Sequence, residues 1–392
     1  MIKTNFQKII DNFIDKAKSI YSDDFIPLHR PIFIGNESKY LIECIDSNFV
    51  SSVGVKVDEL EKKVAEFTGS KYAIATVNGT AALHIAIELA GVKGDDEVIT
   101  QALTFIATCN AISYTGAKPV FIDVDIDTMG LSPLALKNFL EKNAEKRTEG
   151  TFNKISGKRI SACVPMHTFG FPCRIVEIAK ICSNWNIPLI EDAAESLGSF
   201  SNGAHTGTLA SMATLSFNGN KIITTGGGGM IITDNPSLAK RAKHITTTSK
   251  VPHLYEFVHD EIGYNYRMPN INAALGCAQM EYLDEFLNIK TQLANQWDEF
   301  FSNRDVNFVK ALDGNKANHW LNTIILDSKD ERDNFLKSTN SKNVMTRPIW
   351  TLMSKLPMFR DCQTDGLSNS IWLEDRVVNI PSSVPNDLIK NI

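Results

Sequence analysis

The chain has 392 residues, of which 43% are hydrophobic and 22% charged, so it is long enough for one large α/β domain with a smaller companion. Its net charge of −5 argues against non-specific nucleic-acid binding, which requires a basic surface, but it leaves room for an anionic small molecule in a locally positive pocket. The seven cysteines form no C-x-x-C pair, and we therefore expect reduced thiols in a cytoplasmic protein, without disulfides and without a metal site.

The N-terminal segment MIKTNFQKIIDNFIDKAKSIY places its apolar side chains at helical spacing among scattered charges. This pattern predicts an amphipathic helix and not a secretion signal, which needs an unbroken apolar segment. No run of 18 apolar residues occurs, so we expect no membrane-spanning segment and no membrane partner.

From about residue 70, short apolar runs alternate with helical stretches. Strands are predicted at 71–77, 96–101, 118–125, 160–167 and 187–193, with helices at 80–91 and 174–185. This alternation predicts an α/β layer with a mainly parallel sheet. Ligands of such sheets bind at the carboxyl ends of the strands.

The pattern changes after residue 268. Residues 268–304 predict one long helix or two joined helices, and a strand at 320–327 and a helix at 330–339 follow. We therefore expect a smaller α+β domain at the C-terminus. The predicted division is an N-terminal helix (1–25), a large domain (26–265) and a small domain (266–392).

Asp192 ends the apolar run IPLIED. A carboxylate at the carboxyl end of a buried strand is costly unless a partner compensates it. It either serves a ligand or caps a helix or forms a structural ion pair. The neighbouring Glu191 alternates to the opposite face of the strand, so the two carboxylates are not expected to act as an acid/base pair.

Two further candidates follow predicted strands. Asn78-Gly79-Thr80 stands where a strand turns into a helix, and free backbone amides at a helix start form an anion site. The alternative is simple capping by Asn78 or Thr80. Phe105, after the next strand, either stacks on a flat ring or belongs to the core.

Residues 217–231 read FNGNKIITTGGGGMI, and they lie between strand-like segments at 213–217 and 229–234. A nucleotide-binding loop would place its glycines before the lysine, whereas here Lys221 comes first. A lysine enclosed by apolar segments can attack a carbonyl carbon, and Ser216 could add a hydroxyl to a phosphate site. We expect the glycines to adopt positive φ angles where the chain turns back past a crowded pocket.

These candidates together are the parts that hold pyridoxal phosphate: a phosphate-binding helix start, an aromatic plate, a buried aspartate and a lysine that forms an imine. The aspartate would keep the ring nitrogen protonated, and the lysine would later move protons at the substrate carbon.

The motifs also resemble a known family, the DegT/DnrJ/EryC1/StrS sugar aminotransferases, which have the aspartate-aminotransferase fold (pyridoxal phosphate fold type I). The resemblance runs from about residue 25 to the C-terminus. The segments that carry it include KYAIATVNGTAALHIAI (71–87), TFIATCNAI (104–112), IPLIEDAAESLGS (187–199), LSFNGNKIITTGGGGMI (215–231) and GYNYRMPNINAALG (263–276).

The resemblance implies a role for each matching residue. Lys221 would hold the cofactor covalently and Asp192 would pair with its ring nitrogen. Gly79, Thr80 and Ser216 would bind the phosphate, and Phe105 would stack on the ring. Asn265 would reach the phosphate in the neighbouring subunit, with Arg267 near the same interface, which makes a homodimer with shared active sites the catalytic unit.

Two positions set this chain apart within the resemblance. Glu195 stands where many members carry Gln, and a carboxylate there would alter contacts to the cofactor's ring oxygen. A related dehydratase branch replaces the lysine with histidine, whereas this chain keeps Lys221, which favours transamination.

The finer resemblance is to enzymes of bacillosamine and legionaminic acid routes, which act on nucleotide-linked 4-keto-6-deoxy-N-acetylhexosamines. It is carried by IPLHRPIFIGNE (26–37), QALTFIATCNAI (101–112) and TRPIWTLMSKLP (346–357). His319, Trp320 and Trp350 would line the sugar-nucleotide side. Arg30, Arg347 and Lys250 are candidates for the diphosphate, with a solvated surface charge as the alternative for each.

The sequence therefore predicts an aminotransferase that moves an amino group from glutamate to the 4-keto carbon of a nucleotide sugar. Three alternatives stay open: the same fold acting on another keto position or substrate, a regulator that keeps the fold without turnover, and a nicotinamide- or nucleotide-binding enzyme that uses TTGGGG as its loop. The last would need glycines that open a helix, whereas GMIITD is strand-like.

Overall fold

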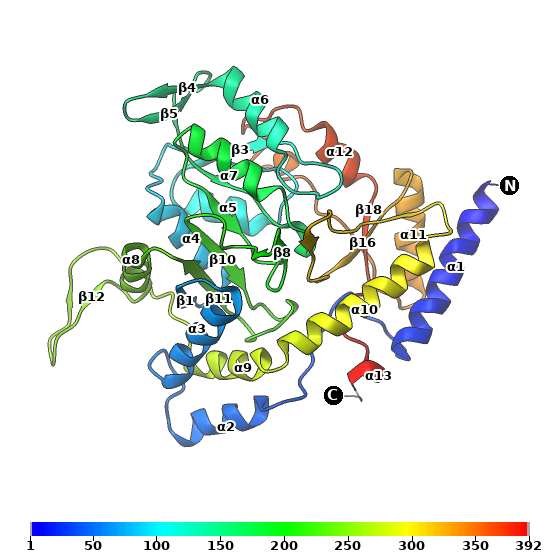
Figure 1. The fold of residues 1–392 in the computed structure, drawn as a ribbon, viewed down its shortest axis with the longest axis horizontal. Helices are drawn as coiled ribbons and strands as arrows, with labels where there is room; N and C mark the ends of the chain where they lie inside the picture. The colour runs from blue at the N-terminus through cyan, green and yellow to red at the C-terminus, as the bar shows by residue number, and fades with distance from the viewer. Residues whose placement is uncertain (1, 390–392) are drawn as a thin grey trace.

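A mainly parallel sheet forms the centre of the larger part of the chain in the computed structural model, which describes residues 2–389 (Figure 1). In spatial order its strands are β1 (Tyr72–Thr76), β11 (Gly229–Thr233), β10 (Met212–Ser216), β7 (Ile190–Asp192), β6 (Arg159–Val164), β2 (Glu97–Gln101) and β3 (Lys118–Ile122). Isolated parallel bridges join β6 to β7. Every strand of this set except β11 runs in the same direction, which confirms the predicted α/β fold.

Helices cover both faces of this sheet because neighbouring strand residues point to opposite sides. Val98 of β2 shares a buried cluster with residues of α4 and α5, whereas the next residue, Ile99, shares one with residues of α6 and α7. Helix α8 lies with α4 on the first face. The bounds of these helices are α4 (Gly79–Leu89), α5 (Ile106–Tyr114), α6 (Pro133–Asn143), α7 (Ile175–Asn184) and α8 (Pro236–Thr246).

The predicted strands and helices of this region are present with shifts of a few residues at their ends. Two hairpins were not predicted. One joins β4 (Ala144–Arg147) and β5 (Gly150–Asn153), and it extends the sheet beside β6. The other, the hairpin arm (residues 250–262), contains β12 (Lys250–Val251) and β13 (Val258–His259) and projects from the body of the molecule (Figure 1).

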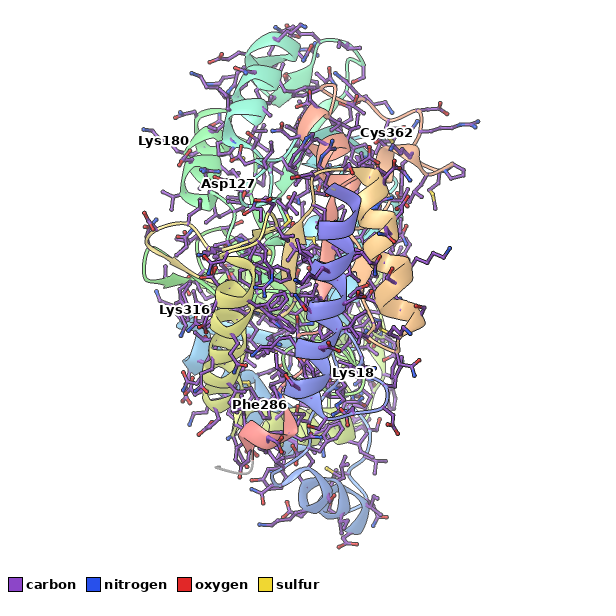
Figure 2. The ribbon with its side chains drawn as sticks, turned by 90° about the vertical axis from the view of Figure 1, so that its right-hand side faces the viewer. Lys18, Asp127, Lys180, Phe286, Lys316 and Cys362 are labelled. Carbon is purple, nitrogen blue, oxygen red and sulfur yellow. The ribbon has the colours of Figure 1, made fainter. Side chains whose placement is uncertain are left out.

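The C-terminal part has its own antiparallel sheet, in the order β14 (Asn307–Phe308), β16 (Asn322–Ile325), β18 (Val377–Ile380) and β17 (Arg347–Pro348). Helices α11 (Lys329–Ser341) and α12 (Ser368–Glu374) belong to this part. The N-terminal helix α1 (Ile2–Tyr21) lies beside α11, as Figure 2 also shows. Its Phe13 packs against Trp297 and Phe335, so the first helix of the chain shares a core with the C-terminal sheet.

The segment predicted as one long helix or two joined helices consists of two, α9 (Asn270–Met280) and α10 (Leu283–Phe301). The first half of α10, through Ile289, packs in the core cluster around the large sheet. The second half, from Leu293, packs in the cluster that contains α1. Helix α10 therefore connects the two parts of the molecule. The predicted boundary at residue 265 stays a prediction.

The remaining elements are short or peripheral. Helix α3 packs against β1 and α9, and α2 packs against α9. The full set of these remaining elements is α2 (Glu37–Asp46), α3 (Val55–Thr68), α13 (Asn386–Ile389), the 3₁₀ turns Thr168–Gly170 and Met353–Lys355, and the small sheet of β8 (Phe200–Ser201), β9 (Ala204–His205) and β15 (Asn315–Lys316). Among the described residues, no helix has the length and apolar character needed to cross a membrane.

Candidate active site

A cavity of about 680 Å³ opens at the carboxyl ends of the parallel strands, where the small antiparallel sheet meets the large one. It combines residues that follow five different strands with residues near β16 and β17. From the large sheet it receives Gly79, Thr80, Phe105, Met166, Phe169, Asp192, Glu195, Ser216 and Lys221, and from the C-terminal part Trp320, Arg347, Trp350 and Asn379.

Helix α4 begins at the cavity wall, directly after β1. The Asn78 side chain caps it by accepting a hydrogen bond from the Ala81 amide at 2.8 Å. The first two helical amides, Gly79 and Thr80, have no acceptor within the helix. The Ser216 hydroxyl lies beside them, since a Cβ on Gly79 would stand 3.2 Å from its Oγ. Two amides and a hydroxyl at the positive end of a helix can bind a phosphate.

The two neighbouring carboxylates of β7 point to opposite faces, as predicted from strand alternation. Asp192 lines the cavity while only 2% exposed. It accepts hydrogen bonds from the Thr108 hydroxyl at 2.7 Å and the Ala194 amide at 3.2 Å. Burial raises the pKa of Asp192. Glu191, on the other face, accepts hydrogen bonds from three backbone amides and lies 2.9 Å from His167 Nε2, so it has a structural role.

Lys221 extends from the loop after β10 into the cavity. Its Nζ lies 3.1 Å from Glu195 Oε1 and 3.9 Å from the centre of the Trp320 ring. The other Glu195 oxygen accepts a hydrogen bond from the Phe169 amide at 2.9 Å. Burial raises the pKa of Glu195 to about 7, although Lys221 acts in the opposite direction. The lysine is therefore held between a buried carboxyl group and an aromatic face.

Aromatic rings line the outer part of the cavity. Phe105 stands at the start of α5 with 47% of its surface exposed, and its ring centre is 6.2 Å from that of Trp350. Trp350 also packs on Phe169 at 4.8 Å. Arg347 lies beside them with its guanidinium near solvent, where it donates to Asn340 Oδ1 at 3.1 Å. These flat rings and one cation suit an aromatic or phosphorylated ligand.

Four other predicted residues lie outside this cavity in the described chain. Arg30 forms an ion pair with Asp23 at 2.6 Å, and the half-buried His319 precedes Trp320 and makes a T-shaped ring contact with Phe171. Lys250 lies in the hairpin arm over the Phe257 ring. Asn265 is exposed and pairs with Thr247, away from its own cavity.

Of the four glycines after Lys221, two are needed for close approach and one for a positive φ, which corrects our expectation. Only Gly226 has a positive φ, at 78°. A Cβ on Gly229 would lie 2.4 Å from the Asn78 carbonyl carbon and 2.6 Å from the Gly79 nitrogen. A Cβ on Gly227 would meet no atom closer than 4.0 Å. Gly229 thus lets β11 pass against the start of α4.

The sequence did not identify two contacts that organise the cavity. Thr108 lies in the first turn of α5, and its hydroxyl donates to Asp192, which is 84 residues away in the chain. The Trp320 ring supports Lys221, and its Nε1 donates to the Asn220 carbonyl at 2.6 Å. Each contact joins residues that are distant in the chain. No sequence spacing predicts such a pair, and the only signal was that a hydroxyl and an indole can donate hydrogen bonds.

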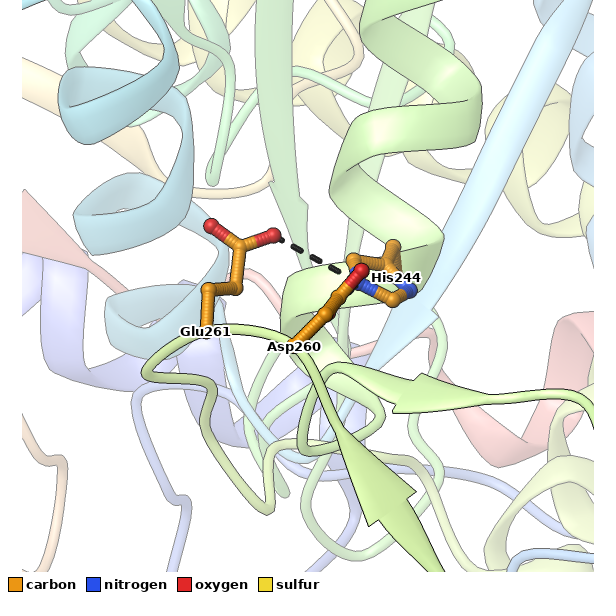
Figure 3. Close-up of side chains that lie close together, drawn as sticks. All are labelled: His244, Asp260 and Glu261. Atoms are coloured by element: carbon orange, nitrogen blue, oxygen red, sulfur yellow. Dashed lines mark hydrogen bonds and ion pairs between the residues drawn. The ribbon is translucent and has the colours of Figure 1, made fainter.

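A second polar cluster lies at the root of the hairpin arm, where His244 faces Asp260 and Glu261 (Figure 3). His244 Nε2 lies 2.7 Å from Asp260 Oδ1 and 3.4 Å from Glu261 Oε1. Arg241 pairs with both oxygens of Glu261. Because the Arg241 guanidinium already compensates the Glu261 carboxylate, we interpret the cluster as a structural contact that holds the arm against α8.

Comparison with known proteins agrees with this geometry. The model of the DegT/DnrJ/EryC1/StrS aminotransferase family matches residues 32–387. The chain belongs to this family. Relatives of this chain include GDP-perosamine synthases from Escherichia coli O157:H7 (35% identical, covering 91% of this chain and 93% of the relative) and from Caulobacter vibrioides (35% identical, covering 87% and 89%).

Solved structures of similar fold include the aminotransferase TlmJ from Streptoalloteichus hindustanus, with a TM-score of 0.82, 25% identity and coverage of 91% of this chain and 93% of that one. Another is DesI in the presence of its TDP-sugar product, with a TM-score of 0.81, 26% identity and coverage of 92% and 88%. This family member is thus a pyridoxal phosphate-dependent nucleotide-sugar aminotransferase with the fold type I architecture.

Proposed function

We propose that this aminotransferase moves an amino group from glutamate to the 4-keto carbon of a nucleotide-linked 4-keto-6-deoxy-(N-acetyl)hexosamine, for the synthesis of a bacterial surface-glycan sugar. Relatives named GDP-perosamine synthase support the position, because perosamine is a 4-amino sugar. The single observation that carries the proposal is the cavity that contains both Lys221 and Asp192 at the ends of neighbouring strands.

The residues of the cavity fit pyridoxal phosphate. The Gly79 and Thr80 amides and the Ser216 hydroxyl would hold its phosphate, and the exposed Phe105 ring would lie against the pyridine. Asp192 would hold the proton of the ring nitrogen, because each of its oxygens keeps a lone pair free beyond the bonds to Thr108 and Ala194. The bound cofactor supplies an electron sink for the substrate carbon.

Lys221 would bind the cofactor covalently and, once displaced from it, take and return a proton at the substrate carbon. Glu195 is close enough to exchange a proton with the amine, at 3.1 Å. Trp320 limits the positions that the amine can occupy, since its ring faces Nζ. Confining the base in this way increases the fraction of orientations that can react.

The outer part of the cavity would receive the sugar nucleotide. Arg347 is our candidate for the diphosphate, because its planar guanidinium lies at the cavity wall without a carboxylate partner among the described residues. Arg30 is a weaker candidate, because Asp23 already compensates its charge. Trp350 would stack on a flat part of the substrate. His319 does not line the cavity, so it would influence the substrate only through its neighbour Trp320.

We also propose that two copies of the chain form a homodimer with shared active sites. The hairpin arm carries side chains that a single copy leaves exposed: Leu254 (97%), Tyr255 (78%), Phe257 (80%) and Ile262 (85%). An apolar surface of this kind on a projecting arm is typical of an interface. Asn265, near the root of the arm and outside its own cavity, is free to approach the partner's site.

Two alternatives remain distinct from this proposal. An enzyme of the same fold could aminate another keto position, and a regulatory protein could bind the cofactor without turnover. The presence of Lys221 and Asp192 in one cavity favours an enzyme over a regulator.

The test is amination of a panel of UDP- and GDP-linked 4-keto sugars with glutamate, read by mass for the change from keto to amine. The purified protein with cofactor is expected to be yellow, and glutamate is expected to bleach that colour. Lys221→Ala is expected to abolish both turnover and borohydride trapping at this position. Turnover of none of the sugars would contradict the substrate, and trapping that survives in Lys221→Ala would contradict the role of the lysine.

A further inference from the structure

Lys290 is a buried lysine in the middle of α10. It is 1% exposed and lies between Ile289, in the core cluster around the large sheet, and Leu293, in the cluster that contains α1. Within residues 2–389 it makes no ion pair with a carboxylate, and burial lowers its pKa to about 7. A buried amine without a counter-charge costs free energy, so its presence calls for an explanation.

The Lys290 amine donates to two backbone carbonyls, those of Trp320 at 3.3 Å and of Ser382. Trp320 comes just before β16 and Ser382 just after β18. Ser382 is itself fixed, because its hydroxyl accepts from the Asn322 amide at 2.7 Å and its amide donates to the Leu28 carbonyl at 2.7 Å. One side chain therefore joins the segments that bring Trp320 and Leu28 to the cavity wall.

Trp320 connects this point to the reactive lysine. Its ring centre is 3.9 Å from Lys221 Nζ, and its indole N–H donates to the carbonyl of Asn220, the residue before Lys221. The ring end of Trp320 is thus bonded to the loop that carries Lys221, and the backbone end is bonded to Lys290.

Two histidines of the described chain, His29 and His319, lie near Lys290, and neither supplies a counter-charge. Burial lowers the pKa of His29 well below its usual value and that of His319 to about 4, and the nearby lysine acts in the same direction for both. Both rings are therefore neutral at physiological pH. An apolar side chain would satisfy the burial of α10 equally well, but it could not donate to the two carbonyls.

We propose that Lys290 is a positioning residue, which fixes the backbone of Trp320 so that the indole ring stays under Lys221. The inference rests on the proposed function only in taking Lys221 as the reactive amine. It concerns the cofactor-free protein as well, so it can be tested without a sugar substrate.

The experiment is a double-mutant cycle on the cofactor-free protein. The rate of acetylation of Lys221 by acetic anhydride is measured at one fixed pH by peptide mass spectrometry. Lys290→Met is expected to raise this rate about threefold or more, because a loosely held ring no longer covers the Lys221 amine, which it faces at 3.9 Å, against the reagent. In a Trp320→Leu background, the same substitution is expected to change the rate no further.

Two controls separate positioning from a general loss of stability. Trp297→Phe removes a comparable buried bond from the same helix, between Trp297 Nε1 and the Pro381 carbonyl at 3.2 Å, and it should leave Lys221 labelling unchanged. Lys56 serves as an internal reference, because it pairs with Glu59 and is far in the chain from Lys221, Lys290 and Trp320. It should be acetylated at the same rate in every variant.

An unchanged Lys221 rate in Lys290→Met would overturn the proposal, and so would an increase that persists in the Trp320→Leu background. If Lys290→Met does not fold, Lys290→Leu replaces it, because its side chain is also apolar and cannot donate to either carbonyl. An increase that disappears in the Trp320→Leu background again supports positioning, and any other result contradicts it.

Discussion

Lys221 Nζ lies 3.1 Å from Glu195 Oε1, so the reactive amine is paired with a carboxyl group that is itself only 3% exposed. Burial raises the pKa of Glu195 to about 7 against a usual value of 4.5. The side chain is fixed on its other side by the Phe169 amide. A glutamine at this position would keep a hydrogen bond to Lys221 but would remove the proton equilibrium.

Glu195→Gln is expected to weaken the pH dependence of stability. A carboxyl group whose pKa is raised by folding stabilises the protein fully below about pH 4.5, and that contribution is lost as the pH rises through about 7. The free energy of unfolding of the cofactor-free protein should therefore fall between about pH 5 and about pH 8 by roughly 2 kcal/mol more than that of Glu195→Gln. Denaturant titrations at the two pH values measure this difference, and parallel losses in both proteins would count against it.

Asp192→Asn and Glu191→Gln should have opposite consequences, because the two side chains occupy opposite faces of β7. Asparagine keeps the shape of Asp192 and removes a costly buried charge, so stability should be unchanged or higher while the amination rate falls by a hundredfold or more. Glu191→Gln weakens its bonds to three amides and His167, so unfolding should become easier by about 2 kcal/mol.

Thermal unfolding and amination assays of the two variants provide the measurement. The assignment of Asp192 to the cofactor would be wrong if its asparagine variant kept normal activity. Equal destabilisation of both variants would instead indicate that Asp192 is structural.

Gly229→Ala should damage cofactor binding, whereas Gly227→Ala should not. The new Cβ at position 229 would displace the backbone of Asn78 and Gly79, whose amide belongs to the proposed phosphate site. We expect the Kd for pyridoxal phosphate to rise at least tenfold. At position 227 the nearest atom is 4.0 Å away, and the Kd should stay within about twofold.

Spectroscopic titration with pyridoxal phosphate measures both values, and pyridoxal without the phosphate serves as the comparison ligand. If the Gly229→Ala defect were equally large for both ligands, the disturbance would not be specific to the phosphate site.

Placing charges on the hairpin arm should dissociate the proposed homodimer. Leu254→Asp combined with Phe257→Asp introduces two charges at side chains that are 97% and 80% exposed in one copy. Burying those charges at an interface is unfavourable, so sedimentation should show a shift towards a single copy. The matched control is Lys137→Asp on α6, where Lys137 pairs with Glu141 at the surface. A double arm variant that sediments like the control would refute the role of the arm.

The sequence was sufficient for the α/β layer and for most of the cavity's residues. Alternating apolar runs predict buried strands, and residues that follow parallel strands meet at one edge, so Gly79, Phe105, Asp192, Ser216 and Lys221 could be expected to lie together. Each of these features can be recognised from neighbouring residues alone: a helix start, a carboxylate at a strand end and a lysine among apolar segments. The family resemblance added the order in which these pieces occur.

Tertiary structure alone decided how these residues are held. Lys221 and Glu195 are 26 residues apart, Thr108 and Asp192 are 84 apart, and Lys290 and Trp320 are 30 apart on different elements. It also decided that α1 packs with the C-terminal sheet and that close contact, and not a positive φ, explains Gly229. The physical reason is that strand and helix periodicity follow from neighbouring residues, whereas side-chain contacts depend on where distant segments pack.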